Sequence, residues 1–238
     1  MKMTKEKNYK MYALFLSVLL LSILITAFTT SKMHQEMDEL TVKRINIIEE
    51  DGTIRMVISN KQKQHSGRMD GQDLDARDRP AGILFFNDEG DEAGGLIFGV
   101  SDENGVSNNS LSLSFDQYKN DQVVQILNNE MIRNGKMQKV RGFIVNDYPE
   151  DSRLLHTLEA VKEAEKIEDA DERRKRMMKI QQESGPRSLV FLGKSRSGNN
   201  GLFLYDADGN PKLMIYVDQE GNPKIQTISE DGKINDAL

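Results

Sequence analysis

The densest group of potentially reactive side chains in this sequence is one short acidic loop. Residues 87–92 read Asn-Asp-Glu-Gly-Asp-Glu and lie between two apolar runs. Carboxylates at this density can hold a hard cation such as Ca²⁺, or can work as a paired general acid and base. The simpler interpretation is a solvated hairpin loop whose charges oppose edge aggregation. We define a candidate polar site that consists of Arg79, Asp88, Glu89, Asp91 and Glu92.

Arg79 joins this site because it ends a long polar segment just before the acidic loop. Residues 61–80 contain few apolar side chains, and a connection of that length is usually functional or disordered. It also carries His65, Arg68 and Arg77. If the fold brings the two segments together, we expect Arg79 to face Asp88 or Asp91. The alternative is a mobile surface loop.

Other chemistry is poorly represented. The chain has no cysteine, which excludes disulfides, thiolate nucleophiles and thiolate metal sites. Its three histidines lack metal-ligand spacing, and neither a Gly-x-Ser-x-Gly motif nor a glycine-rich phosphate loop occurs. Residues 206–210, Asp-Ala-Asp-Gly-Asn, place glycine fourth where an EF-hand loop needs it sixth, so they predict a turn. We expect no cofactor, and a non-enzymatic role is favoured over catalysis.

The elements that would position the acidic loop are β-hairpins. Residues 42–59 hold two alternating apolar runs around Asp51-Gly52, a pair typical of a type I′ turn with positive φ at both positions. Further strands are predicted from similar runs at 83–86, 94–100, 110–115, 121–127 and 139–147. In residues 189–233, Asp/Glu-Gly turns recur every 11 or 12 residues, which predicts a meander of short strands.

One segment departs from this pattern. Residues 151–185 are rich in Ala, Glu, Lys, Leu and Met, and Gly185-Pro186 is a helix stop signal. Asp151 or Ser152 can cap the start, and residues 169–171 can divide the segment into two helices. We predict a helical insertion, either a solvated element packed by one thin stripe on the sheet or an oligomerisation or partner-binding element.

The N-terminal segment predicts where the chain resides. Met11 to Thr30 contains no charged residue and, as a helix, would span about 30 Å, the thickness of a bilayer core. Four lysines precede it against one glutamate, which favours an N-terminus inside and a C-terminal domain outside the cytoplasmic membrane. The run is long for a signal peptide, so we expect an uncleaved signal anchor; secretion after cleavage is the alternative.

Charge and length also indicate how the chain is organised. The net charge is −6, and because the first ten residues contribute +3, the part beyond residue 30 carries about −9. An acidic surface argues against nucleic acid as a partner. The predicted organisation is a basic cytoplasmic tail at 1–10, the anchor at 11–30, a linker at 31–40 and an extracytoplasmic domain at 41–238. The predicted fold is mainly antiparallel β, a sandwich or open barrel of about eight to eleven short strands.

Four strings of this sequence resemble an uncharacterised family of bacterial exported or membrane-anchored β-rich proteins. They are RINIIEEDGTIRMVISNKQKQHSG, RDRPAGILFFNDEGDEAGGLIFG, SLSFDQYKNDQVVQI and LMIYVDQEGNPKIQ, at residues 44–67, 77–99, 112–126 and 213–226. The resemblance covers most of residues 42–233. It implies a bacterial envelope setting and a shared β domain, and it carries no activity, ligand or catalytic residue.

Three functions are compatible with these observations. The favoured one is a membrane-anchored binding or scaffolding domain with an envelope protein partner or a homo-oligomeric state. The second is a carboxylate-dependent hydrolase of envelope glycan or peptide that uses residues of the acidic loop. The third is a calcium-stabilised adhesive module.

Overall fold

The structure is a computed structural model that describes residues 2–28 and 36–237. The chain divides into two compact units, Met1–Thr41 and Val42–Leu238, and each is described by itself. The first unit contains helix α1 (Lys2–Phe28), in which residues 7–24 are long and apolar enough to cross a membrane. The helix thus begins inside the predicted tail at 1–10. Residues 29 and 30 of the predicted anchor, and 31–35 of the predicted linker, lie outside the described residues.

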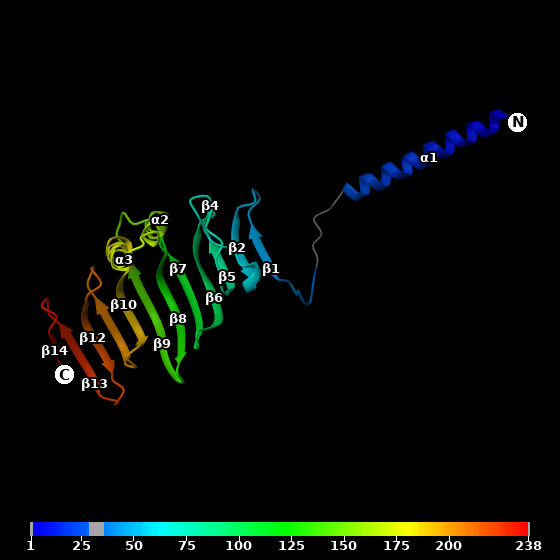
Figure 1. Cartoon of the computed structure of the whole chain (residues 1–238). Helices are drawn as coiled ribbons and strands as arrows, with labels where there is room; N and C mark the ends of the chain where they lie inside the picture. The colour runs from blue at the N-terminus through cyan, green and yellow to red at the C-terminus, as the bar shows by residue number, and fades with distance from the viewer. Residues whose placement is uncertain (1, 29–35, 238) are drawn as a thin grey trace. The chain divides into compact units, whose positions relative to one another are not determined.

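The second unit is built on one twelve-stranded antiparallel sheet (Figure 1). Its strands follow the chain in the order β1-β2-β5-β6-β7-β8-β9-β10-β11-β12-β13-β14, so each connection joins neighbours. Their bounds are β1 (Arg44–Ile48), β2 (Ile54–Ser59), β5 (Ala81–Phe86), β6 (Glu92–Glu103), β7 (Val106–Asp116), β8 (Gln122–Arg133), β9 (Lys136–Asp147), β10 (Arg187–Lys194), β11 (Asn200–Tyr205), β12 (Pro211–Val217), β13 (Pro223–Ile228) and β14 (Ile234–Asp236).

This architecture confirms the mainly antiparallel β prediction and its meander. The predicted total of eight to eleven strands is too low, because the sheet alone has twelve and a separate two-stranded ribbon adds more. The form differs from a sandwich of two packed sheets: β1 and β14 are the two open edges of one large sheet. Most consecutive strands are joined by short hairpin loops, and the two long connections, at residues 60–80 and 148–186, also return to the neighbouring strand, so all twelve strands stay in one sheet.

The hairpin loops explain the recurring Gly signals. In the β1–β2 loop, Glu49 N donates to Thr53 O at 2.9 Å and Gly52 N donates to Glu49 O at 3.0 Å. Gly52 has φ +90° and Asp51 is not in the positive region, so the predicted type I′ turn is wrong there. The loop is a three-residue connection with a left-handed glycine. The same pair of backbone hydrogen bonds recurs in the loops that start at 87, 195, 206, 218 and 229.

The two faces of the sheet differ in composition. Residues directly opposite each other on paired strands share a face, and alternate residues along a strand point to opposite faces. The register therefore produces one row of aliphatic or aromatic side chains across the sheet. We call the face that carries it the apolar face, and its central row is Ile45, Ile58, Ile83, Leu96, Leu113, Ile126, Phe143, Leu192, Leu202, Ile215 and Ile225.

The other side, the opposite face, is partly covered by the chain itself. Residues 60–80 form a second layer with a 3-10 turn η1 (Lys61–Lys63) and a ribbon of β3 (Arg68–Met69) and β4 (Gln72–Asp73). The core lies beneath this layer, where Val57, Leu84 and Phe86 form a cluster that is at most 4% exposed. The expectation of a mobile or disordered loop at 61–80 is thus wrong, because His65 packs edge-on against Phe86 with ring centroids 5.1 Å apart.

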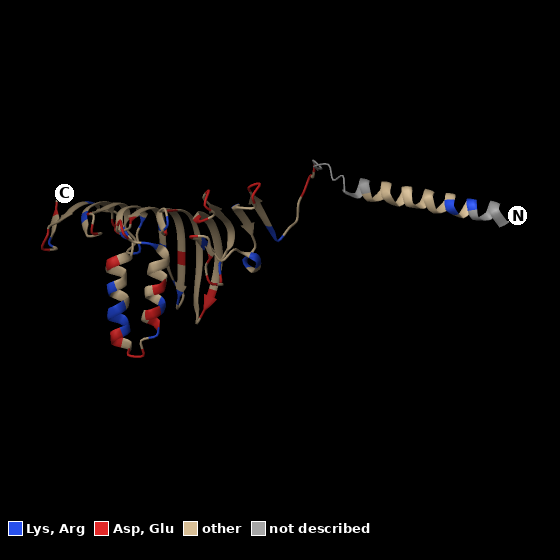
Figure 2. Cartoon of the chain, turned by 90° about the horizontal axis from the view of Figure 1, so that it is seen from above, with Lys and Arg blue, Asp and Glu red and all other residues tan. Residues whose placement is uncertain are grey.

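The helical insertion forms a hairpin of α2 (Leu154–Glu165) and α3 (Ala170–Ser184). Asp169 caps α3 by accepting from the backbone N–H groups of residues 171 and 172, which confirms the predicted division. The predicted cap at 151–152 is wrong: Ser152 donates instead to Ser184 O at 2.9 Å. Figure 2 shows both helices projecting from the sheet side by side. Lys162 of α2 pairs with Asp75 at 2.5 Å, so the hairpin borders the layer on the opposite face.

Candidate functional site

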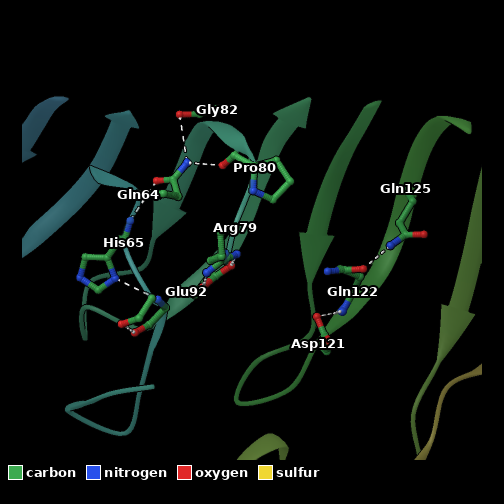
Figure 3. Close-up of polar contacts among 11 residues, drawn as sticks. Gln64, His65, Arg79, Pro80, Gly82, Glu92, Asp121, Gln122 and Gln125 are labelled. Carbon is green, nitrogen blue, oxygen red and sulfur yellow. Dashed lines mark hydrogen bonds and ion pairs between the residues drawn. The ribbon is translucent and has the colours of Figure 1, made fainter. Parts of the chain in front are cut away.

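The predicted polar site lies at the end of the sheet where β5 turns into β6. One of its elements is the forked ion pair between Arg79 and Glu92, with nitrogen–oxygen distances of 2.8 and 2.6 Å (Figure 3). Both side chains are nearly buried, at 12% and 13% exposed. Burial acts to lower the pKa of Arg79, but the hydrogen bonds and charge of Glu92 outweigh it and raise that pKa. Arg79 therefore does not face Asp88 or Asp91 as expected.

Asp91 belongs to a different cluster, centred on Lys119 of the β7–β8 loop. The Lys119 ammonium contacts Asp91, lies 2.6 Å from Glu89 and lies 2.8 Å from Asp70. The hydrogen bonds that Lys119 donates to Asp70, Asp91 and Glu89 raise the pKa of Lys119, and the hydrogen bond with Lys119 lowers the pKa of Glu89. This one side chain ties the β7–β8 loop to the β5–β6 loop and the β3–β4 ribbon. Sequence reasoning missed it, because a lone lysine in a turn gives no signal of three partners.

Asp88 points outward and completes the loop. It pairs with Arg55 of β2, which also lies 3.2 Å from Glu49. The loop itself is closed by the Asn87 side chain, whose Oδ1 accepts from the backbone N–H groups of Glu89 and Asp91 at 2.9 and 3.0 Å. All four acids of the loop are thus held by cations from three other segments. These ion pairs hold the β5–β6 loop against the neighbouring segments.

A second pair of acidic residues, Asp116 and Asp121, lies at the two ends of the loop that joins β7 to β8. Neither residue belongs to the predicted site. Burial, together with the nearby charges of Asp121 and Glu92, raises the pKa of Asp116 to about 8. Burial also raises the pKa of Asp121, whose carboxylate accepts from the backbone N–H of Gln122 (Figure 3). Within the part of the chain that the structure describes, Asp116 Oδ1 has no hydrogen-bond partner. The turn that follows Asp116 is closed by Gln117 and Asp121 in the way that Asn87 and Asp91 close the β5–β6 loop, so the repeated turn was a signal available in the sequence.

These groups bear on the calcium and hydrolase hypotheses. Over residues 2–28 and 36–237, no three His, Cys, Asp or Glu side chains gather in a way that could hold a metal ion. The acids of the predicted site are paired with Arg79, Lys119 or Arg55, and so they are occupied in ion pairs. What remains chemically distinctive is a buried carboxyl, Asp116, that retains a proton near neutral pH.

A groove of about 540 Å³ separates α2 from the β3–β4 ribbon. Leu74, Leu155 and Leu158 form its apolar lining, and the pair Lys162–Asp75 bridges it. The charged residues around it have both signs, so the groove shows no preference for one class of ligand.

The largest candidate surface is the apolar face. Nearly all of the strongly exposed large hydrophobic residues in the described strands lie on it; the exceptions are Ile48 and Ile234 at the two ends of the sheet. The exposed members are Ile47, Ile58, Leu96, Phe98, Val100, Leu111, Phe115, Ile126, Ile132, Met137, Phe143, Leu192, Ile215 and Val217. Sequence reasoning predicted the alternation but not that the apolar side would be bare.

β7 illustrates the asymmetry between the faces. Leu111 and Phe115 point to the apolar face and are 41% and 50% exposed, whereas Ser114 points to the opposite face and is 9% exposed. A folded monomer usually places such a strand the other way round, with leucine inside and serine outside. A contiguous apolar surface of this extent on a folded domain marks an interaction site.

Comparison of the chain with family models, with curated proteins and with solved structures returned no match.

Proposed function

We propose that this chain is a single-pass membrane protein whose domain at residues 42–238 lies outside the cytoplasmic membrane and works as a non-catalytic binding or scaffolding module. The observation that carries this proposal is the bare apolar face of the twelve-stranded sheet. Such a face provides a broad recognition surface and no enclosed reaction site.

The N-terminal unit supports the membrane part of the proposal. Helix α1 contains an 18-residue window that is apolar enough to span a bilayer, and its described side chains from residue 7 to residue 24 are all exposed. An apolar helix of this length is suited to a lipid environment. Four lysines at its start favour an N-terminus in the cytoplasm. The resemblance to exported bacterial proteins supports the same setting.

The ion pairs support the non-catalytic part. The four acids of residues 88–92 are each held by a cation and stabilise the sheet end, so they are not free to share the work of an acid and a base.

Topology is tested directly in cells, because the chain has no native cysteine. A Lys7→Cys variant and a Glu220→Cys variant are expressed at full length in bacteria and treated with a membrane-impermeant maleimide. We expect labelling of Glu220→Cys in intact cells, labelling of Lys7→Cys only after lysis, and full-length chain that resists carbonate extraction. Equal labelling of both sites before lysis, or release of the shortened domain into the medium, would contradict the proposal.

A further inference from the structure

We propose that the apolar face is the contact between two copies of this chain, which pack face to face to form a two-layered β-sandwich. The proposal deepens the proposed function, because it names the partner of the same surface. It assigns the missing second layer of the fold to a second copy.

The composition of the face fits a symmetric contact. Its central row carries no charged residue in any strand from β1 to β13. Most charged side chains of this face lie on the Asn134-Gly135 side of the central row. Arg141, which pairs with Glu130, and Lys194 are next to that row, and Asp147 is at the other end of its strand. An apolar centre with a polar rim is the usual anatomy of an interface. Two identical apolar rows can meet about a twofold axis without placing like charges opposite each other.

The exposed area also matches what a stable dimer needs. The exposed members of the apolar face range from 36% to 73% exposed. Because a side chain of this size has about 150–200 Å² of surface, a half-exposed one offers roughly 75–100 Å². Ten such residues would bury about 750–1,000 Å² per copy, which is the size of a standard protein interface. Two sheets that pack in this way lie about 10 Å apart, so the rows can interdigitate.

The opposite face is less available for the same contact. Residues 60–80 cover its first strands, and the α2–α3 hairpin stands beside that layer. One side of the sheet is therefore partly occupied within the chain and the other is free. Anchoring by α1 would confine copies to one membrane surface, which raises their effective concentration and favours self-association.

The test uses the full-length chain in a mild detergent and measures its mass by analytical ultracentrifugation over a range of protein concentrations. Two variants on one strand form a matched pair: Ile126→Glu on the apolar face and Asn129→Glu on the opposite face, both at exposed positions. We expect a dimer for the wild type and for Asn129→Glu. For Ile126→Glu we expect a rise in Kd of at least 100-fold, with unchanged far-UV circular dichroism.

A crosslinking measurement keeps the proposal testable if Ile126→Glu fails to fold. Single cysteines at Leu96, Ile126 and Leu192 sample the central row across the sheet, and a short bis-maleimide should join at least one of them into a dimer; Asn129→Cys should remain monomeric.

Three results would overturn the dimer. They are a monomeric wild type at tens of micromolar, a dimer that Ile126→Glu leaves intact, and a monomer whose apolar-face cysteines become protected only when lipid vesicles are added. The topology experiment is independent: if it succeeds while the mass is monomeric, only the face-to-face contact is lost.

Discussion

The two faces of one sheet show two different ways of handling apolar surface. On the opposite face, the β2 and β5 residues Val57 and Leu84 are at most 1% exposed, because residues 60–80 fold over them. On the apolar face, the neighbouring Ile58 is 41% exposed although it belongs to the same strand. The covered face is packed like a domain core, whereas the bare face has the residue composition of a core but is exposed. Within residues 42–237, the chain thus supplies a second layer for one side of the sheet, and we propose that a second copy covers the other side.

The largest expected effect concerns the buried ion pair that fastens the cover. Arg79→Met leaves the nearly buried Glu92 carboxylate without its cation, and loss of one partner of a buried pair costs about 3–5 kcal/mol. We expect this loss in the free energy of unfolding of the full-length chain, measured by urea denaturation followed by circular dichroism. Lys61→Met, which breaks the exposed pair with Asp78, is the control and should change stability by less than about 1 kcal/mol. Equal effects for the two variants would show that the Arg79–Glu92 pair is not part of a core.

A second prediction compares apolar truncation on the two faces. Leu84→Ala removes a fully buried side chain beneath residues 60–80 and should destabilise the fold by about 2–5 kcal/mol. Ile126→Ala removes a side chain that is 56% exposed, so it should cost less than about 1 kcal/mol in the monomer and should weaken self-association instead. Urea denaturation at low protein concentration gives the first quantity, and ultracentrifugation gives the second. Similar stability losses in the monomer would remove the contrast between the faces.

The third prediction concerns pH. Because burial raises the pKa of Asp116 from 3.8 to about 8, the folded state holds a proton that the unfolded state has already lost. The resulting stabilisation is complete below about pH 4 and is lost as pH rises through about 8. We expect Asp116→Asn, which cannot ionise, to gain about 1–3 kcal/mol over the wild type at pH 8 and little at pH 4. The measurement is the melting temperature of both proteins at the two pH values; a difference that does not change with pH would contradict the buried-carboxyl account.

The smallest expected effect concerns a loop. Asp218 Oδ1 accepts from the backbone N–H groups of Glu220 and Asn222 at 3.0 and 2.8 Å, and the Asn222 hydrogen bond lowers the pKa of Asp218. Asp218→Ala should therefore destabilise the β12–β13 hairpin by about 0.5–1.5 kcal/mol. The matched change Glu220→Ala, on an exposed side chain of the same loop, should stay within about 0.5 kcal/mol. Thermal melts resolve this difference, and indistinguishable variants would show that the capping bonds contribute nothing.

The sequence predicted the local structure well and the layering poorly. Alternation and Gly-containing turns located the hairpins, because strand period and turn geometry depend on residues a few positions apart. Asp169 likewise marked the division between the two helices. Alternation cannot say whether the apolar side of a strand meets another sheet of the same chain. The predicted sandwich therefore became a single open sheet.

The candidate site was predicted in part for the same reason. All five residues, Arg79, Asp88, Glu89, Asp91 and Glu92, lie near one end of the sheet, but they form separate ion pairs. Lys119 was missed because its role depends on contacts with residues about 30 to 50 positions away, and Asp116 was missed because its raised pKa depends first on burial. Charge composition alone does not reveal which acid a given cation reaches.

The most direct test of the central claim, that the apolar face is covered when the protein is at work, is a comparison of maleimide labelling rates in native membranes. Ile126→Cys and Asn129→Cys place one thiol on each face of the same strand, at positions that are exposed in the isolated chain. The account predicts at least a tenfold slower reaction at residue 126 than at residue 129, with the difference abolished by denaturation. Equal rates at the two positions in native membranes would contradict it.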